Sequence, residues 1–490
     1  MALLAWGLMA SSWGQAALPA KIVQLARDQG VDTQQLSVLV LPLERTGVAR
    51  GEELALQAAR PMNPASTMKL LTTLVSLEQL GPTYRWRTAL LSEAPVQAGV
   101  LQGPLYLRGG GDPALGWEQL GSMLRSLRAQ GISRIEGDLV LDRQYFTPNR
   151  PDQRQPPFDD YPDAYYNVVP DAALVGSNLL SFSLSSSTDS VDIQMLPPLA
   201  GVVLENGLKL TDMSCHDWGD ELDLPQTRQD PDGSLHLTLL GGFPRNCKTD
   251  LQLNVLDRNV YIERVAKALW QELGGSWQGS VHDGSVPAGA RLLVERRSET
   301  LADLVKQATK RSDNTMVRTL YLTLGVERAQ RQGSMGDTLA DARLAVQDWL
   351  TRHDIDPTGL VLENGAGLSR LERITPAQLA AVLRVGALSD WSAEYQTSLP
   401  IAALDGTMRN RLHGTVAAGR ARIKTGSLDD VAAVAGYVRD SADRSWVLVA
   451  IANQPQALRA RPVLDALIEW VASGQAGQAA RLGRKQKRSR

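Results

Sequence analysis

The sequence has few of the residues from which metal and redox sites are built. Its 490 residues include two cysteines and five histidines, and neither H-E-x-x-H nor C-x-x-C occurs. Because zinc and dithiol sites need such side chains at fixed spacings, we expect no metal ion and no cofactor. The formal net charge is only −2, so no overall field favours a nucleic-acid partner.

Long hydrophobic runs are also scarce, and no stretch is long and apolar enough to predict a transmembrane helix. The short apolar run 2–10, followed by the small residues of Gly14-Gln15-Ala16, predicts a signal peptide over residues 1–16. We therefore expect an exported, periplasmic protein. Export permits a disulfide between Cys215 and Cys247, which we favour over two unpaired thiols.

Residues 473–490 begin with a Gly-, Ser- and Gln-rich stretch and end in a basic cluster. The favoured interpretation is a flexible, solvated tail. The alternative is peripheral contact with an anionic membrane surface, which attracts clustered Lys and Arg side chains. The basic residues are Arg481, Arg484, Lys485, Lys487, Arg488 and Arg490.

Hydrophobic patterning divides the chain into helical and strand-rich parts. With 43% hydrophobic residues the chain can build cores, and 490 residues exceed one compact domain. We expect an α+β domain of residues 17–89 and 291–472, interrupted by a strand-rich insertion over 90–290 with an inner subdomain at about 183–256. Helices are expected at 20–29, from 66 onward, and at 301–309, 316–324, 338–353, 376–385 and 462–472; strands are expected at 36–41, 53–57, 105–107, 137–142, 235–240, 422–425, 431–438 and 445–451.

Three short motifs follow one another along the chain: Ser66-Thr-Met-Lys69, Ser312-Asp-Asn314 and Lys424-Thr-Gly426. Each is weak alone, but together they are the parts of a serine acyl-transfer site whose general base is a lysine. Ser66 and Lys69 lie three apart on a predicted helix, so their side chains share a face. Pro64 suits the first helical turn, which places Ser66 near the positive end of the helix dipole.

The second motif offers a proton relay and a substrate contact. Ser312 can pass a proton between Lys69 and a leaving amine, and Asn314 can hydrogen-bond a substrate amide. Because S-x-N is a common pattern, a polar loop or a helix cap is the alternative interpretation.

The third motif begins a predicted strand. Lys424 supplies positive charge for a substrate carboxylate and a second cation that would favour a neutral, basic lysine at 69. Gly426 removes a side chain and lets a substrate backbone lie along the strand. The backbone N–H groups of Ser66 and Ser427 are candidates for an oxyanion hole.

With these motifs the chain resembles the penicillin-recognising serine enzymes, and most closely the penicillin-binding protein 4 group, the S13 family of D-alanyl-D-alanine carboxypeptidase/endopeptidases. The long gap between Ser66 and Ser312 distinguishes this group from β-lactamases and smaller carboxypeptidases. The resemblance covers residues 20–472, although the family more often has Asp at position 364 and Ser at position 366. Further matching segments are Tyr106-Leu-Arg-Gly-Gly-Gly-Asp-Pro113, Asn364-Gly-Ala-Gly-Leu-Ser-Arg370, Asp405-Gly-Thr-Met408 and Lys424-Thr-Gly-Ser-Leu428.

The resemblance implies a β-lactamase/transpeptidase-like domain, an antiparallel sheet flanked by helices, that cleaves D-Ala peptide bonds in peptidoglycan stem peptides and is acylated by β-lactam antibiotics. Arg370 and Asp142 are candidate contacts for a charged stem-peptide residue, although structural roles in a loop and at a strand end are favoured for both. The other implied roles are Ser66 as nucleophile, Lys69 as base, Ser312 as relay, Asn314 as amide anchor, and Lys424 with Thr425 as carboxylate grip.

Other functions stay open at this point. A serine β-lactamase shares the three motifs but needs a glutamate-held water, and no E-x-x-L-N segment lies between Ser312 and Lys424. A non-catalytic peptidoglycan-binding protein with a relic site would not need all three motifs intact. A Ser-His-Asp hydrolase is disfavoured because G-x-S-x-G does not occur.

Overall fold

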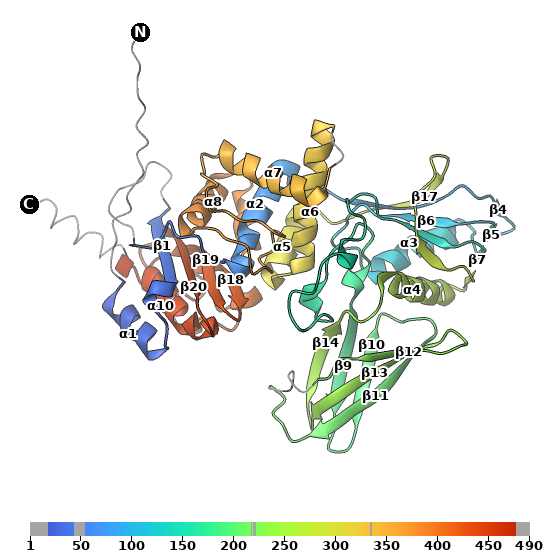
Figure 1. The fold of residues 1–490 in the computed structure, drawn as a ribbon, viewed down its shortest axis with the longest axis horizontal. Coiled ribbons are helices and arrows are strands. Elements are labelled where there is room, and N and C mark those ends of the chain that lie inside the picture. Colours follow the sequence, from blue (N-terminus) through green and yellow to red (C-terminus); the bar gives the residue numbers. More distant parts are fainter. Residues whose placement is uncertain (1–17, 44–53, 217, 219–221, 334–335, 477–490) are drawn as a thin grey trace, which may run out of the picture. The chain divides into compact units, whose positions relative to one another are not determined.

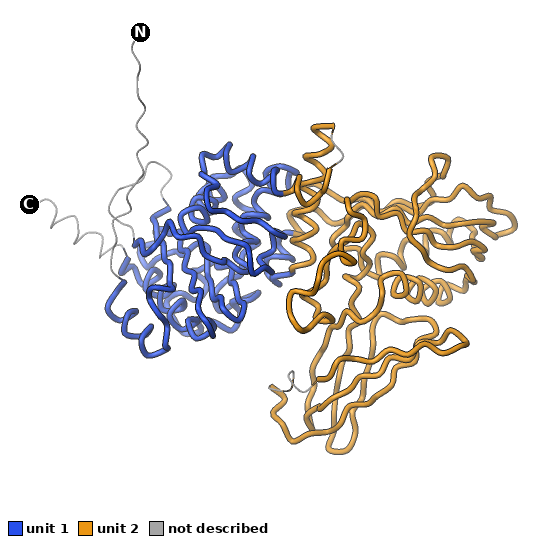
Figure 2. The backbone as a smooth tube through the Cα atoms, viewed as in Figure 1, with its two compact units in different colours: residues 1–82, 305–313, 343–490 blue, residues 83–304, 314–342 orange. Residues whose placement is uncertain are grey.

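The computed structural model describes residues 18–43, 54–216, 218, 222–333 and 336–476. The expected signal peptide and most of the basic tail lie outside these residues. The chain divides into two compact units (Figure 2): unit 1 comprises residues 1–82, 305–313 and 343–490, and unit 2 comprises residues 83–304 and 314–342. Unit 2 thus includes residues 83–89, 291–304 and 314–342, which were expected in the interrupted α+β domain.

Unit 1 is built on a five-stranded antiparallel sheet (Figure 1). The central strands are apolar on both faces, so helices must cover both sides. In sheet order the strands are β18 (Ala421–Leu428), β19 (Val431–Arg439), β20 (Ser445–Asn453), β1 (Leu36–Pro42) and β2 (Leu54–Leu56).

Two groups of helices cover this sheet. Helices α1 (Ala20–Asp28) and α10 (Arg461–Ala472) share a core with one face, because Ile22 and Leu464 join the same buried cluster as Val434 and Leu448. On the other face Tyr437 donates a hydrogen bond to the carbonyl of Leu383 in α8. The remaining helices of unit 1 are α2 (Lys69–Leu80), α8 (Pro376–Leu388), α9 (Ser392–Ser398) and most of α5 (Leu301–Arg311) and α7 (Thr338–Arg352).

Unit 2 contains two mixed sheets packed with helices. The first has the order β16 (Val281–Asp283), β8 (Leu139–Asp142), β6 (Leu105–Arg108), β3 (Arg87–Ser92) and β17 (Arg291–Arg297). The second has the order β15 (Ser276–Trp277), β7 (Arg134–Ile135), β5 (Val100–Leu101) and β4 (Val96–Gln97). The helices of this unit are α3 (Trp117–Ala129), α4 (Arg258–Glu272) and α6 (Asn314–Gln332).

A pair of three-stranded sheets forms an inner part of unit 2. Its chain enters and leaves at neighbouring points, because Leu180 pairs with Leu253 and Asn178 Nδ2 donates to Asn254 Oδ1 at 2.7 Å. One sheet has the order β10 (Val191–Leu196), β9 (Leu180–Ser186) and β14 (Lys248–Leu253); the other has the order β11 (Val202–Thr211), β13 (Leu235–Pro244) and β12 (Gln226–Gln229).

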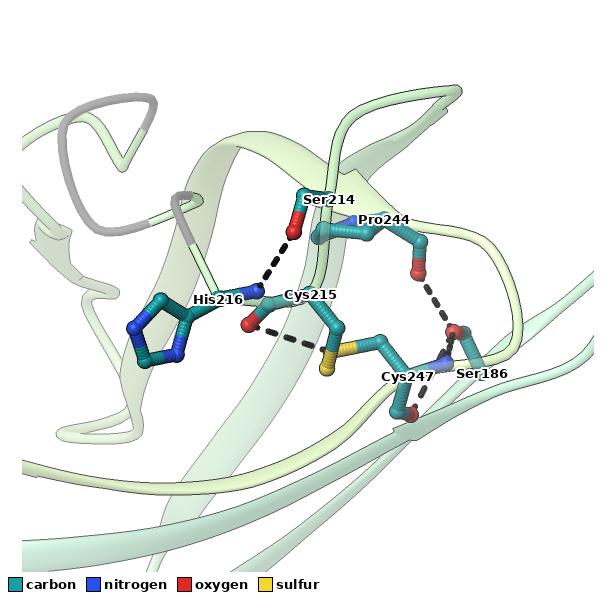
Figure 3. The surroundings of a disulfide bond; sticks show 6 residues. All are labelled: Ser186, Ser214, Cys215, His216, Pro244 and Cys247. Carbon is teal, nitrogen blue, oxygen red and sulfur yellow. Dashed lines mark hydrogen bonds between the residues drawn. A yellow bond between two sulfur atoms is a disulfide. The ribbon is translucent and has the colours of Figure 1, made fainter.

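The two cysteines are joined within this inner part, as predicted (Figure 3). Cys215 and Cys247 form a disulfide with their Cα atoms 5.4 Å apart. Ser186 supports the Cys247 side, since its Oγ accepts a hydrogen bond from the Cys247 N–H at 3.0 Å and donates one to the Pro244 carbonyl at 2.5 Å. The bridge therefore ties the segment after β11 to the start of β14.

The prediction of mostly strand structure between 90 and 290 was wrong for α3 and α4. Helix α3 buries Leu120, Met123, Leu124 and Leu127, a helical spacing visible in the sequence. Short alternating runs on either side dominated the prediction, and α9 was missed because its seven residues are too few to show a clear period. No helix among the described residues combines the length and apolarity needed to cross a membrane.

Candidate active site

The first motif lies where a tight turn becomes a helix in unit 1. Residues Ala65–Met68 form a 3₁₀ turn, and α2 begins at Lys69, rather than the single helix expected from residue 66. Side chains three apart are eclipsed in 3₁₀ geometry, so Ser66 and Lys69 still share a face. Lys69 Nζ donates a hydrogen bond to Ser66 Oγ at 2.9 Å. Lys69 is fully buried, whereas Ser66 is half-buried.

The loop of residues 364–370 contacts the side chain of Lys69. The Ala366 carbonyl accepts a hydrogen bond from Lys69 Nζ at 2.5 Å. Gly367, at a φ of +81°, lies so close to the nucleophile turn that a Cβ there would be 1.8 Å from the Ala65 carbonyl oxygen. Ala65 itself has a φ of +43°, a conformation that L residues hold only when their surroundings enforce it. The site is therefore held by packing on both sides of Ser66.

The second and third motifs meet in the same unit. Lys424 Nζ donates to Ser312 Oγ at 2.9 Å and to the Thr425 carbonyl at 2.7 Å. Ser312 lies in the turn between α5 and α6 and has a φ of +59°. Lys424 is fully buried, and this burial, together with the charge of Lys69, holds the pKa of Lys424 well below its usual value. Two amines therefore share one desolvated site.

The third motif lies on β18, an edge strand of the described sheet. Ile423 N–H points away from β19 and donates to Pro400 outside the sheet. Because hydrogen-bonding direction alternates along a strand, the N–H of Ser427 points the same way. A Cβ at Gly426 would lie 2.6 Å from the Pro64 carbonyl oxygen, so only glycine lets the strand pass this close to the nucleophile turn.

Further residues that the sequence analysis did not select hold these motifs. Asn63 Oδ1 accepts from the Ala65 N–H at 2.9 Å, and the Asn63 N–H donates to Asn453 Oδ1 at 2.7 Å across 390 positions. Thr425 Oγ1 donates to Thr407 Oγ1 at 2.9 Å. The sequence pointed to Thr407 only through the matching segment Asp405-Gly-Thr-Met408. No local pattern pointed to Asn63 or Asn453.

The remaining candidates are distributed over both units. Arg370 is exposed at the end of the loop 364–370 in unit 1, whereas Asn314 and Asp142 belong to unit 2. Asn314 begins α6, and its Nδ2 donates to the Tyr166 carbonyl at 3.2 Å. The Asp142 carboxylate is buried at the end of β8 and accepts from the N–H groups of Gln144 and Val286 at 3.0 and 3.1 Å. These bonds are typical of a structural carboxylate.

Comparisons with known proteins agree with this geometry. Residues 18–473 match the model of the D-Ala-D-Ala carboxypeptidase 3 (S13) family. A D-alanyl-D-alanine carboxypeptidase of Actinomadura sp. is 29% identical over 80% of this chain and 73% of its own length, and one from Haemophilus influenzae, DacB, is 27% identical over 80% of each. The crystal structure of H. influenzae penicillin-binding protein 4 aligns with a TM-score of 0.71 at 22% identity, covering 92% of this chain and all of that one, which confirms the expected fold.

Proposed function

Because the chain belongs to the D-Ala-D-Ala carboxypeptidase 3 (S13) family, we propose that Ser66 and Lys69 carry out its acyl transfer. The protein is a serine-type D-alanyl-D-alanine carboxypeptidase or D,D-endopeptidase that acts on peptidoglycan stem peptides. The observation that carries the assignment of residues is the 2.9 Å hydrogen bond between Lys69 Nζ and Ser66 Oγ in a buried site. An amine this close to a hydroxyl can take its proton directly.

Acylation begins when neutral Lys69 accepts the proton of Ser66 Oγ. The oxygen attacks the carbonyl carbon of the D-Ala residue before the scissile bond, and the carbonyl oxygen becomes negatively charged. We assign the stabilisation of that charge to the N–H groups of Ser66 and Ser427. Burial, and after it the neighbouring charge of Lys69, lowers the pKa of Lys424; to Lys69 we assign the neutral form that a base must have.

The leaving group then receives a proton. Ser312 Oγ donates to the nitrogen of the leaving D-Ala or cross-link amine as the C–N bond breaks, and Lys69 returns its proton through Ser312. Lys424 Nζ donates to Ser312 Oγ. With the Thr425 hydroxyl, which would exchange its bond to Thr407 for one to the substrate, Lys424 is proposed to bind the carboxylate beside the scissile bond. Water later attacks the ester on Ser66 and releases the shortened peptide.

Binding of the rest of the stem peptide is assigned to the edge of β18. An extended peptide can add to this edge because Gly426 presents no side chain there. Asn314 is proposed to hydrogen-bond a substrate amide. Arg370 is a proposed contact for a stem-peptide carboxylate, since its side chain is exposed; for Asp142 the backbone hydrogen bonds favour a structural role over the substrate contact.

Location follows from the same chemistry. Peptidoglycan lies outside the cytoplasmic membrane, and the disulfide suits an oxidising compartment. We therefore assign the protein to the periplasm and residues 1–16 to a signal peptide. For the basic tail, peripheral membrane contact stays the alternative to a solvated segment.

One experiment tests this function directly. The purified chain is incubated with a stem peptide that ends in D-Ala-D-Ala and with a cross-linked dimer, and the products are weighed by mass spectrometry. Loss of one D-Ala from the first or separation of the second supports the proposal. If neither product forms and a penicillin leaves no adduct, the site is a relic; rapid nitrocefin turnover would instead indicate a β-lactamase.

A further inference from the structure

Glu372 is a completely buried carboxylate that no step of the reaction uses. We propose that Glu372 is a positioning residue for Lys69, because it holds in place the loop whose carbonyl groups contact the helix that carries this lysine. The inference rests on the proposed role of Lys69 as the base. It adds to that role a residue outside the three motifs.

The carboxylate gathers three backbone donors on one oxygen. Glu372 Oε1 accepts from the N–H groups of Glu363 at 3.0 Å, Asn364 at 2.9 Å and Gly365 at 2.8 Å. Within the described residues Oε2 is buried without a hydrogen-bond partner. Charge-assisted bonds of this kind are stronger than neutral ones. The first turn of the loop is therefore organised around a single side-chain atom.

The same loop delivers two carbonyl groups to α2. The Ala366 carbonyl accepts from Lys69 Nζ at 2.5 Å, and the Gly365 carbonyl accepts from Thr72 Oγ1 at 2.6 Å. Lys69 and Thr72 lie three apart on α2, and both are fully buried. Glu372 Oε1 thus binds the N–H of Gly365, and the carbonyl of Gly365 binds Thr72 on α2. The next carbonyl, that of Ala366, binds Lys69, so residues 365–366 connect the carboxylate to the lysine.

A fixed Ala366 carbonyl matters for the direction of the lysine lone pair. A neutral amine has two N–H bonds and one lone pair, and donation of one N–H to Ala366 limits the rotation of Nζ. The lone pair can then face Ser66 Oγ, which lies 2.9 Å away. A misplacement of about 1 Å in such a group can cost roughly 10²-fold in rate.

Burial and hydrogen bonding act on Glu372 in opposite directions. Burial raises the pKa of Glu372, and the three backbone N–H groups lower it by a smaller amount. A glutamine would offer an oxygen acceptor at the same place without the cost of burying a charge. Glu372→Gln can therefore show whether the loop needs the oxygen acceptor or the negative charge of this side chain.

The test uses the full chain and measures penicillin acylation as a binding constant K and an acylation rate k2. Glu372→Ala is expected to lower k2 by roughly 10- to 100-fold with K unchanged, and Glu372→Gln should restore most of k2. Asp440→Ala is the matched control. Asp440 is also fully buried in unit 1 and accepts from Ala442 N, Arg444 N and Trp446 Nε1, but it lies in the β19–β20 turn. Asp440→Ala should lower the stability of the protein and leave k2 unchanged.

The outcomes separate the two proposals. Wild-type k2 in Glu372→Ala, beside a Lys69→Ala variant that no longer acylates, overturns the positioning role and leaves the proposed function intact. An equal loss of k2 in Asp440→Ala also overturns it, because the effect would then be general destabilisation. If Lys69→Ala acylates normally, the proposed function itself fails. Should Glu372→Ala not fold, Glu372→Asp decides: its shorter side chain should lower k2 several-fold, and an unchanged k2 overturns the proposal.

Discussion

Lys424 Nζ donates a hydrogen bond to Ser312 Oγ at 2.9 Å although the two residues are 112 positions apart in the sequence. The contact joins the second and third motifs through a buried amine. It gives Ser312 a fixed donor, so the hydroxyl proton of Ser312 is free to point toward a leaving group.

Ser66→Ala should remain folded and form no penicilloyl adduct in an intact-mass measurement, because the nucleophilic oxygen is gone. Lys69→Ala should slow adduct formation by about 10²- to 10⁴-fold, since Ser66 would lose its base. Ser76→Ala is the control: Ser76 is buried on the same helix and donates only to the Thr72 carbonyl. A full adduct on Ser66→Ala would contradict the assignment.

Lys424→Met should lose recognition of peptides with a free C-terminal carboxylate while the protein becomes more stable. Burial lowers the pKa of Lys424, so the folded state binds this proton more weakly than the unfolded state. The stability of the wild type should then rise with pH between the lowered pKa and about 10.4, and the variant should lack this rise. Replacement of the buried charge should add about 1 to 2 kcal/mol near neutral pH.

Urea unfolding at several pH values measures the stability difference between the Lys424→Met variant and the wild type. Hydrolysis of a free-acid peptide and of its C-terminal amide measures recognition. An equal loss of activity on both peptides would count against the carboxylate contact.

Gly367→Ala should slow acylation more than a Gly→Ala substitution at a position of similar φ elsewhere in the chain. The new Cβ would meet the Ala65 carbonyl at 1.8 Å, which must push the nucleophile turn or the loop aside. Gly414→Ala is the matched control, because Gly414 has a similar φ of +70° and nothing within 4 Å of the added Cβ. The control should cost about 1 kcal/mol of stability and keep full acylation. Equal acylation rates in the two variants would refute the close packing proposed around Ser66.

Removal of the disulfide should weaken unit 2 without affecting the chemistry. Cys215 and Cys247 are 32 positions apart, and in the chain-entropy model a bridge over such a loop contributes roughly 3 to 4 kcal/mol. The double variant Cys215→Ser/Cys247→Ser should therefore unfold at lower denaturant concentration and still be acylated by penicillin at the wild-type rate. Two alkylatable thiols in native, export-purified protein would show that the bridge does not form.

The inner part of unit 2 should be removable. Asn178 and Asn254 are joined by a 2.7 Å hydrogen bond, so a short Gly-Ser linker can replace residues 179–253 with little displacement of the ends. The shortened protein should keep penicillin acylation, because none of the three motifs is lost. We predict that these sheets shape the access of cross-linked substrate, so activity on intact sacculi should fall in the shortened protein. A folded deletion variant that cleaves sacculi as well as the full chain would contradict this.

Local patterns in the sequence were enough to predict the family, its enzymatic activity and much of the secondary structure. The spacing of Ser66 and Lys69 needs only one helical turn, and the apolar runs of β19 and β20 need only the strand period to be recognised. The disulfide prediction followed from the expected export and from the presence of two cysteines that could pair. Helices α3 and α4 were missed where short strands on either side masked their period.

Tertiary structure alone decided which distant residues support the motifs. The sheet order β18-β19-β20-β1-β2 brings Asn453 to Asn63, and the loop before α8 brings the Ala366 carbonyl to Lys69 from 297 positions away. Such pairings leave no trace in hydrophobic periodicity, because a single buried amide or carboxylate interrupts a pattern rather than extending it. Glu372 is the clearest case: its sequence position suggests a surface loop, and only the folded chain reveals the three N–H groups that it binds.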